Sequence, residues 1–336
     1  MDAPRATSRD VARLAGVAQS TVSYVLAGKG SISPATRERV LRAAEELHYR
    51  PNLAARAMRT RRTGRVAAVM GLPAYDPAAM LAGASAAAQA AGYAMDVLHV
   101  DGSVETRSER VLELARSGQF EGVLSFTPLL PAVQDHAPDG VPVAVSDTFD
   151  DDMHAAGELV DSSPVVTFVE HLAALGHTRF LHVAGPPEYA SAVARRDAYL
   201  ATVERLGLTS LGVVEGDWSG RAGLHAIRSL PEHAPPLAVI ASNDLVAVGV
   251  MRGAAERGWS VPGDVSVTGW DNAAVGPYLT PSLTTVDTDR TEAGRRAMRQ
   301  LVAALHAEPA PAGLPPLTTV VWRESTAPPA HRDARP

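Results

Sequence analysis

The N-terminal stretch from Thr7 to Thr63 constrains the fold most, because short amphipathic helical patterns follow one another there without a gap. The first helix begins at Thr7 or Ser8, whose hydroxyls can accept from the free amides of its first turn, and Gly16 ends it. A small apolar face is predicted for this helix from three residues: Val11, Ala12 and Leu14.

A second helix fits Gln19 to Leu26, after a turn at 16–18. Val22, Val25 and Leu26 have the spacing of a buried face. The opposite face is polar and has short side chains, as a helix needs if it is to lie in the major groove and bond to base edges. The side chains predicted to contact DNA from this helix are Gln19, Ser20, Thr21, Ser23 and Tyr24.

A third helix is predicted to begin at Ser33-Pro34, which supplies a capping hydroxyl and a preorganised first turn, and to stop at Arg50-Pro51. Its expected buried stripe consists of Val40, Leu41, Ala44 and Leu47. Three helices around one small core form an all-α helix-turn-helix domain, predicted here over residues 1–50, with a hinge and linker at 51–64.

These residues resemble the N-terminal signature of the LacI/GalR family of bacterial transcription regulators. The resemblance rests on runs with that family's spacing: 10–17 (DVARLAGV), 21–23 (TVS), 33–37 (SPATR), 49–52 (YRPN) and 55–56 (AR). It implies that Asn52 to Arg59 form a hinge helix that orders on DNA, with Met58 inserted into the minor groove to kink the duplex. Ordinary helix packing is the other interpretation of Met58. The contacts implied outside the second helix are Thr7, Ser8, Asn52, Arg56, Met58 and Arg59.

Two positions depart from the family pattern where DNA would be read. Ala18 replaces the usual Ser, which removes one capping group, worth about 1 kcal/mol. Tyr24 stands where Arg or His is frequent, and a phenol cannot make the two hydrogen bonds of Arg to guanine. Tyr24 therefore either changes the preferred base pair or contacts only a phosphate, and the sequence leaves both interpretations open.

The charge is unevenly distributed along the chain. Residues 1–65 hold 13 of the 31 Lys and Arg residues but 5 of the 37 Asp and Glu residues, although the net charge of the whole chain is -6. A basic N-terminal region attracts the phosphate backbone and makes affinity depend on salt. The cluster at 59–62 fits phosphate contact, and a solvated linker is the alternative.

From Arg65 onward, short β-rich runs alternate with amphipathic helical runs, which predicts two parallel α/β lobes over residues 65–327. The predicted strands are 66–70, 95–100, 122–126, 141–146, 180–184, 237–241, 265–269 and 317–323, and the predicted helices are 78–91, 105–116, 165–175, 192–206, 245–257 and 291–305. A crossover is expected at 282–286. The last dozen residues, including a tail at 328–336, are expected to be disordered.

Open α/β sheets bind ligands at the carboxyl ends of their strands, here between the two lobes. The second half of the chain resembles the periplasmic-binding-protein-like effector domain of the same family through four runs: 171–177 (HLAALGH), 184–186 (AGP), 241–244 (ASND) and 265–271 (VSVTGWD). The resemblance implies a small-molecule effector, most simply a sugar, with a purine or another metabolite as the alternative. The implied effector contacts are Tyr75, Ser125, Asp147, Arg195, Trp218, Asn243 and Asp271.

Each implied effector contact has a structural alternative. Arg195 could form a surface ion pair, Asn243 and Asp271 could serve turns, and Trp218 could belong to the core. The segment at 71–76 departs from the aromatic sequence common in the family, so the identity of the effector is less transferable from the family to this chain.

No dinucleotide, Walker A, His-Glu-x-x-His or Gly-x-Ser-x-Gly motif is present in the sequence, so no catalytic residue, metal site or cofactor is predicted. The absence of cysteine and of a strongly apolar run favours a cytoplasmic protein without a membrane segment. One recognition helix reads few base pairs, which favours a homodimer on a pseudo-palindromic operator. A sugar- or nucleoside-handling enzyme with a DNA-binding head and a constitutive DNA-binding protein remain alternatives.

Overall fold

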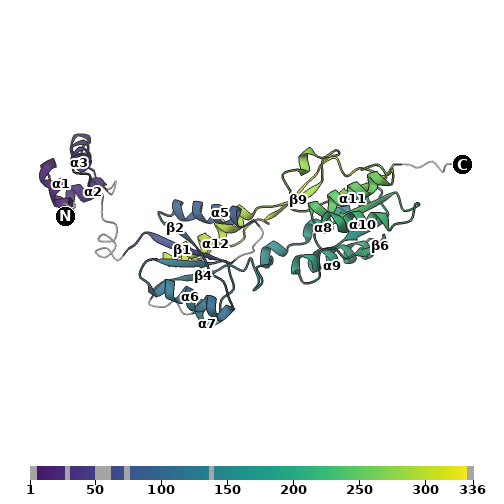
Figure 1. The fold of residues 1–336 in the computed structure, drawn as a ribbon, viewed down its shortest axis with the longest axis horizontal. Coiled ribbons are helices and arrows are strands. Elements are labelled where there is room, and N and C mark those ends of the chain that lie inside the picture. The colour runs from purple at the N-terminus through teal and green to yellow at the C-terminus, as the bar shows by residue number, and fades with distance from the viewer. Residues whose placement is uncertain (1–5, 27–30, 50–61, 72–75, 136–139, 331–336) are drawn as a thin grey trace. The chain divides into compact units, whose positions relative to one another are not determined.

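The computed structural model describes residues 6–26, 31–49, 62–71, 76–135 and 140–330. The chain divides into two compact units, Met1–Thr63 and Gly64–Pro336 (Figure 1). Each unit has its own hydrophobic core, and the two are described separately below.

The first unit is a three-helix domain formed by α1 (Ser8–Ala15), α2 (Gln19–Leu26) and α3 (Pro34–Glu46). Its core consists of small side chains: Val11, Ala12, Ala15, Val22, Val25, Val40, Ala43 and Ala44. Two predicted core positions are wrong, because Leu14 and Leu41 are 47% and 49% exposed. Ala43 occupies the place in the stripe that the sequence assigned to Leu41, and the short apolar spacing left both faces possible.

Local hydrogen bonds explain where these helices start and stop. The amide and the hydroxyl of Thr7 both donate to the carboxylate of Asp10, at 2.9 and 2.7 Å, which fixes the start of α1. Gly16 ends α1 with φ of 62°, a left-handed conformation that favours glycine. Ser33 accepts from the amide of Thr36 at the start of α3.

The second unit contains two lobes with the same strand order. In lobe one, four parallel strands lie in the order β2-β1-β3-β4: β1 (Arg65–Met70), β2 (Ala94–His99), β3 (Gly122–Ser125) and β4 (Val143–Val145). The helices α5 (Pro77–Ala90) and α12 (Arg290–Leu305) cover one face, and α6 (Val104–Arg116) and α7 (Pro131–Asp135) cover the other. Both faces of this sheet are therefore buried.

Lobe two repeats this arrangement with the order β6-β5-β7-β8: β5 (Arg179–Val183), β6 (Thr209–Val214), β7 (Leu237–Ala241) and β8 (Val265–Thr268). The helices α8 (Ser163–Ala174) and α9 (Ala190–Arg205) pack on one face, and α10 (Gly220–Arg228) and α11 (Asp244–Glu256) on the other. The predicted class, two parallel α/β lobes behind a helical domain, is confirmed.

Three segments connect the lobes. The first runs through residues 146–162 and contains the short helix η2 (Gly157–Val160). The other two contain β9 (Thr285–Thr288) and β10 (Thr318–Val321), which pair with each other as an antiparallel ribbon. We call β9 and β10 the crossover strands. The predicted crossover at 282–286 lies three residues too early.

Some elements of the second unit were not predicted from the sequence. Strand β6 lies at a sheet edge, is interrupted by a register shift and contains Gly212 with φ of 118°. Helix α10 is short and contains Gly220 and Gly223, and the close packing of Gly223 on α11 leaves no room for a Cβ. Because of these glycines, the sequence shows neither a clear strand pattern for β6 nor a clear helical pattern for α10. Helix α7 and the 3-10 helices η2 and η3 (Gly276–Tyr278) are shorter still.

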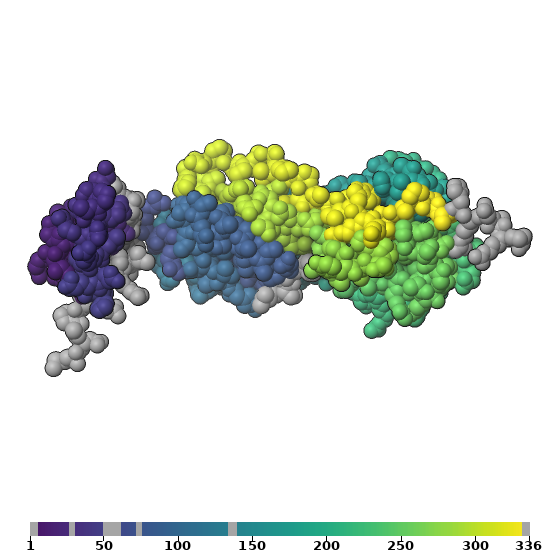
Figure 2. Space-filling view, turned by 90° about the horizontal axis from the view of Figure 1, so that it is seen from above, coloured from purple at the N-terminus to yellow at the C-terminus, as the bar shows by residue number. Residues whose placement is uncertain are grey.

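The prediction that the last dozen residues are disordered is wrong for residues 325–330. Ser325 is fully buried and donates from its hydroxyl to the carbonyl of Val267 at 2.7 Å. Further along, the amide of Ala330 donates to the carbonyl of Gly263 at 2.9 Å. The described C-terminal residues, yellow in Figure 2, thus pack on lobe two beyond the predicted domain limit at 327.

Candidate functional site

Helix α2 carries the polar face that the sequence predicts for DNA recognition. Gln19, Ser20 and Tyr24 are exposed, Tyr24 to 53%, and Thr21 and Ser23 are half-buried. The amide group of Gln19 donates to the hydroxyl of Ser8 at 2.8 Å, which ties the start of α2 to the start of α1. The predicted hinge contacts lie outside the described residues: Asn52, Arg56, Met58 and Arg59.

Four predicted effector contacts meet at the carboxyl edge of the sheet in lobe two. Trp218 follows β6, Asn243 follows β7, Asp271 follows β8, and Arg195 lies on α9, which follows β5. Parallel strands bring their carboxyl ends to one edge, so residues separated by up to 76 positions in sequence become neighbours there. We call Arg195, Trp218, Trp270 and Asp271 the lobe-two cluster.

Arg195 is the buried cation of this cluster, with 8% of its surface exposed. Its Nη1 donates to the carbonyl of Ser242 at 2.6 Å, and its guanidinium lies 3.7 Å from the ring centre of Trp270 and 5.9 Å from that of Trp218. Burial lowers the pKa of Arg195 to about 10, and the carboxylate of Asp271 acts in the opposite direction. The bond to Ser242 joins the connections after β5 and β7, where the order of strands reverses.

Asp271 lies between two arginines. Its Oδ1 is 3.4 Å from Nη2 of Arg290, the first residue of α12 in lobe one, and Arg195 also acts on its charge. Burial raises the pKa of Asp271, and both guanidiniums oppose that shift. The backbone at Asp271 has φ of 99°, a left-handed value that is rare for a residue with a side chain. The surrounding structure must therefore hold this carboxylate in place.

Asn243 and Trp218 support one another. The side chain of Asn243 accepts from the amide of Val246 at 2.8 Å, capping α11, and donates to the carbonyl of Trp218 at 3.1 Å. The ring of Trp218 lies over Gly185, where a Cβ would stand 2.4 Å from it. Asn243 thus has the structural role of a helix cap. Position 185 in the AGP run is a glycine because the ring of Trp218 leaves no room for a side chain there.

Two aromatic residues beside Trp218 were not predicted from the sequence. Tyr189, just before α9, meets the ring of Trp218 edge-on at 5.5 Å, and His154 from the first connecting segment lies 4.0 Å from Tyr189. A row of rings therefore links the lobe-two cluster to the segment that leaves lobe one. No sequence motif marks either residue.

Asp244 was also missed, although it belongs to the ASND run. It is buried, and its two carboxylate oxygens accept from the hydroxyl of Thr285 on β9 and from the amide of Ala273, each at 2.6 Å. Burial raises its pKa to about 6, against the effect of these two hydrogen bonds. Asp244 therefore joins α11, the loop after β8 and a crossover strand.

This raised pKa predicts a pH-dependent free energy of unfolding. Because the folded-state pKa of about 6 exceeds the ordinary value of 3.8, the folded state binds the proton more tightly between these values. The contribution of Asp244 to stability is fully present below about pH 4, falls as the pH rises to about 6 and is lost above it. Relative to Asp244→Asn, we expect wild-type stability in urea denaturation to fall by up to about 3 kcal/mol across this window. Parallel pH profiles for the two proteins would contradict the shift, with the exposed Asp197→Asn as the control.

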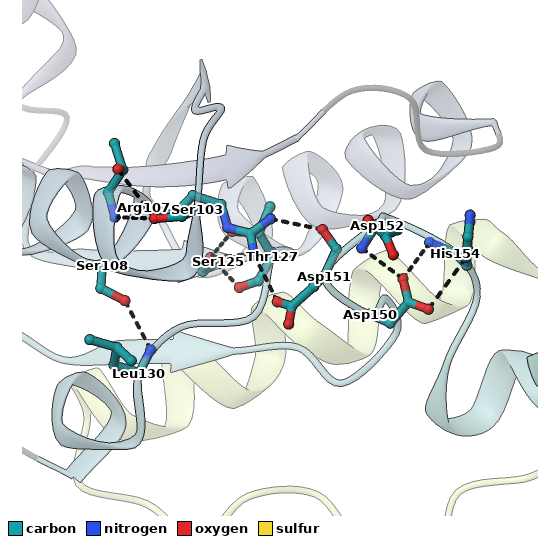
Figure 3. Close-up of polar contacts among 11 residues, drawn as sticks. Ser103, Arg107, Ser108, Ser125, Thr127, Leu130, Asp150, Asp151, Asp152 and His154 are labelled. Atoms are coloured by element: carbon teal, nitrogen blue, oxygen red, sulfur yellow. Dashed lines mark hydrogen bonds and ion pairs between the residues drawn. The ribbon is translucent and has the colours of Figure 1, made fainter. Parts of the chain in front are cut away.

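In lobe one, Ser125 lies in a polar network at the carboxyl edge of the sheet (Figure 3). Its hydroxyl donates to the carbonyl of Thr127 at 2.8 Å and is fully buried. Nearby, the buried Arg107 on α6 donates to the carbonyl and the carboxylate of Asp151, at 3.1 and 2.8 Å. This pair fixes the first connecting segment to lobe one. The structure thus gives Ser125 internal hydrogen bonds.

Asp147 is not brought together with the lobe-two cluster. It lies on a separate cavity of about 220 Å³ between the end of β4, α12 and the proline-rich loop at 311–314. Its neighbours there include Glu158 and Arg296, which pair at 3.0 Å. Tyr75 lies outside the described residues.

Within the ranges described above, no group of His, Asp and Glu side chains has the arrangement of a metal site. The ring of His171 instead contacts that of Trp322 in a tilted arrangement, with 4.1 Å between ring centres, and His177 bonds to Ser266 and to the carbonyl of Ala327. Among the described helices, none is long and apolar enough to cross a lipid bilayer.

Two family models match this chain. Residues 7–52 match bacterial regulatory proteins of the lacI family, and residues 169–326 match a periplasmic binding protein-like domain. These ranges contain the three-helix unit and most of lobe two.

Whole-length relatives agree with these models. The chain is 31% identical to the ribose operon repressor of Escherichia coli K12, over 88% of this chain and 92% of that repressor, and 32% identical to the transcriptional regulator CelR of Thermobifida fusca, over 90% and 93%. Among solved structures, it is similar to the lac repressor dimer bound to operator and the anti-inducer ONPF (TM-score 0.71, 28% identity, covering 96% and 99%) and to the CelR-cellobiose complex (TM-score 0.55, 28% identity, covering 96% and 100%). The chain belongs to the LacI family of bacterial regulatory proteins.

Proposed function

We propose that this protein is a cytoplasmic transcriptional repressor, not an enzyme, that binds a pseudo-palindromic operator as a homodimer and is controlled by a small-molecule effector. The exposed polar face of α2 on a basic unit supports DNA binding. The similar lac repressor structure is a dimer on its operator, which supports the same assembly here. The hinge segment at 51–64 is proposed to order on the central base pairs of the operator.

The lobe-two cluster is the observation that supports an effector site. The buried guanidinium of Arg195 stands over the ring of Trp218 and interacts with the half-buried carboxylate of Asp271, at the sheet edge where α/β folds bind ligands. Hydroxyl groups can donate to Asp271 and accept from Arg195, and a pyranose or furanose ring can pack on an indole. A sugar is therefore the proposed effector class, in agreement with the ribose operon repressor and the CelR-cellobiose complex.

A purine or a related metabolite is the alternative effector, because a flat heterocycle could also stack on Trp218 and bond to the same charges. Asp271, Arg195 and Trp218 are proposed as contacts in both cases. Tyr75, Ser125 and Asn243 stay secondary candidates, and Asp147 would need the lobes to present it differently, since it now lies on a separate cavity.

The test begins with selection of bound sequences from random duplex DNA by the purified protein. An enriched palindrome, bound more tightly or more weakly when ribose, cellobiose or adenine is added, would support the proposal. Failure to enrich any sequence would contradict DNA recognition. Enrichment without a response to a broad panel of sugars and purines would favour a constitutive DNA-binding protein, and turnover of a panel compound would favour an enzyme.

Variants at Tyr24 separate its two interpretations. Tyr24→Arg is expected to shift the preferred base at one position of each half-site to guanine, because arginine bonds twice to a guanine edge. Tyr24→Phe is the matched control, which keeps the ring and removes the hydroxyl. If Tyr24→Arg instead strengthens binding to all sequences about equally, the residue faces a phosphate. The measurement is the same selection, repeated with each variant.

A further inference from the structure

The loop after β8 holds two consecutive residues with a left-handed backbone. Asp271 has φ of 99° and Asn272 has φ of 47°, and neither is a glycine. Such a conformation persists where neighbouring groups fix it. The groups that fix the backbone of this loop also position the carboxylate of Asp271.

Asn272 makes three hydrogen bonds that hold this loop. Its side-chain carbonyl accepts from Nη2 of Arg323 at 2.6 Å, and its side-chain amide donates to the carboxylate of Asp287 at 3.2 Å. Its backbone amide donates to the hydroxyl of Thr285 at 3.3 Å. Arginine can only donate and a carboxylate can only accept, so the orientation of the carboxamide is determined by its partners.

These partners lie on β9 and just beyond the end of β10. Thr285 and Asp287 lie on β9, and Arg323 follows the end of β10 by two residues. Arg323 is itself held, since its Nη1 donates to the carbonyl of Leu283 at 2.7 Å. The backbone amide of Asp271 adds a bond to the carbonyl of Val286 on β9 at 2.9 Å. The loop after β8 is thus hydrogen-bonded to β9 and to the segment that follows β10, both of which belong to the connections with lobe one.

The chain continues directly from this contact into lobe one. After β9 comes Asp289, which caps α12, and then Arg290, whose guanidinium reaches back to Asp271. A displacement of the Asp271 loop would therefore act on β9 through Asn272 and on the start of α12 through Arg290. Both routes end in the lobe whose first strand, β1, begins two residues after the helical unit ends.

We propose that Asn272 is a positioning residue that transmits the state of the effector site at Asp271 to the two crossover strands. This inference rests on the proposed function, because it assigns a role within the control of DNA binding by an effector. This role of Asn272 requires no contact between its side chain and the effector. Its loss should therefore change coupling more than it changes either binding event.

The variant Asn272→Gly tests this, because glycine adopts the left-handed backbone without strain but makes neither side-chain bond. Operator affinity without effector and effector affinity without DNA are each expected to stay within about threefold of wild type. The ratio of operator Kd values with and without ribose, cellobiose or adenine, whichever acts on wild type, is expected to move at least about fivefold toward 1.

The matched variant is Arg323→Met, which removes the donor of the hydrogen bond from Arg323 to the side chain of Asn272. In the coupling ratio, the double variant should add little to either single one, since both break one connection. Thermal unfolding of each variant checks that the fold is kept. A merely structural role would lower the unfolding temperature and leave the coupling ratio of the folded protein unchanged.

The outcomes separate this inference from the proposed function. If wild type responds to a compound of the panel and Asn272→Gly responds equally, the transmitting role of Asn272 is wrong and the proposed function stands. If wild type shows no response to any compound, the proposed effector control fails, and this inference fails with it. A reduced coupling ratio with both affinities preserved is the result that supports Asn272.

Discussion

Replacing Asp271 by asparagine is expected to weaken effector binding by about 100-fold, which corresponds to about 3 kcal/mol. The carboxylate interacts with Arg195 and Arg290, so its neutral replacement removes a negative charge beside two guanidiniums. It also removes one acceptor for an effector hydroxyl. Isothermal titration of the compound that acts on wild type measures the loss.

Asp197→Asn is the matched control for this prediction, because Asp197 lies on the same helix as Arg195 but is exposed. It should bind the effector as wild type does. Equal effector affinity for the two variants would show that Asp271 only shapes its turn, the structural alternative that the sequence left open.

Replacing Val22 by aspartate is expected to abolish operator binding, by at least about 1,000-fold, by unfolding the N-terminal unit. Val22 is fully buried in a core of valines and alanines, and a domain of this size has few other contacts to compensate for a buried charge. Effector binding should be retained, because the second unit has its own cores.

Leu14→Asp provides the comparison, since Leu14 is 47% exposed. Thermal unfolding followed by circular dichroism should show the transition of the N-terminal unit for Leu14→Asp and none for Val22→Asp. Loss of that transition in both variants would mean that Leu14 packs inward, as its spacing in the sequence suggested. Retention of the transition in both variants would contradict the placement of Val22 in the core.

The sequence predicts the architecture well where the patterns are long and strongly periodic. Strands β1 and β7 are almost continuous apolar runs, because each is buried on both faces of a parallel sheet, and β5 and β8 follow the same pattern apart from His182, Ser266 and Thr268. Strand β6 escaped prediction because it lies at an edge and contains a glycine, and Leu14 was misplaced because eight residues of helix leave the apolar face ambiguous.

Only those residues of the candidate site that lie in or near a sequence motif could be predicted. The runs at 184–186, 241–244 and 265–271 point to the edge where Arg195, Trp218 and Asp271 meet. Arg290, Tyr189 and Asn272 escaped because their roles depend on contacts between segments distant in sequence, such as the bond from Arg323 to Asn272 across 51 positions. Spacing along the chain carries no information about such contacts.

Control of operator binding by an effector is tested most directly by a measurement of thermodynamic linkage. The operator Kd is measured by fluorescence anisotropy with and without saturating effector, and the effector Kd by titration with and without the selected operator. If an effector controls DNA binding, both Kd values change and the two ratios are equal, because coupling between two binding sites is reciprocal. An operator Kd that no sugar or purine changes, in a protein that still binds its operator, would contradict this control.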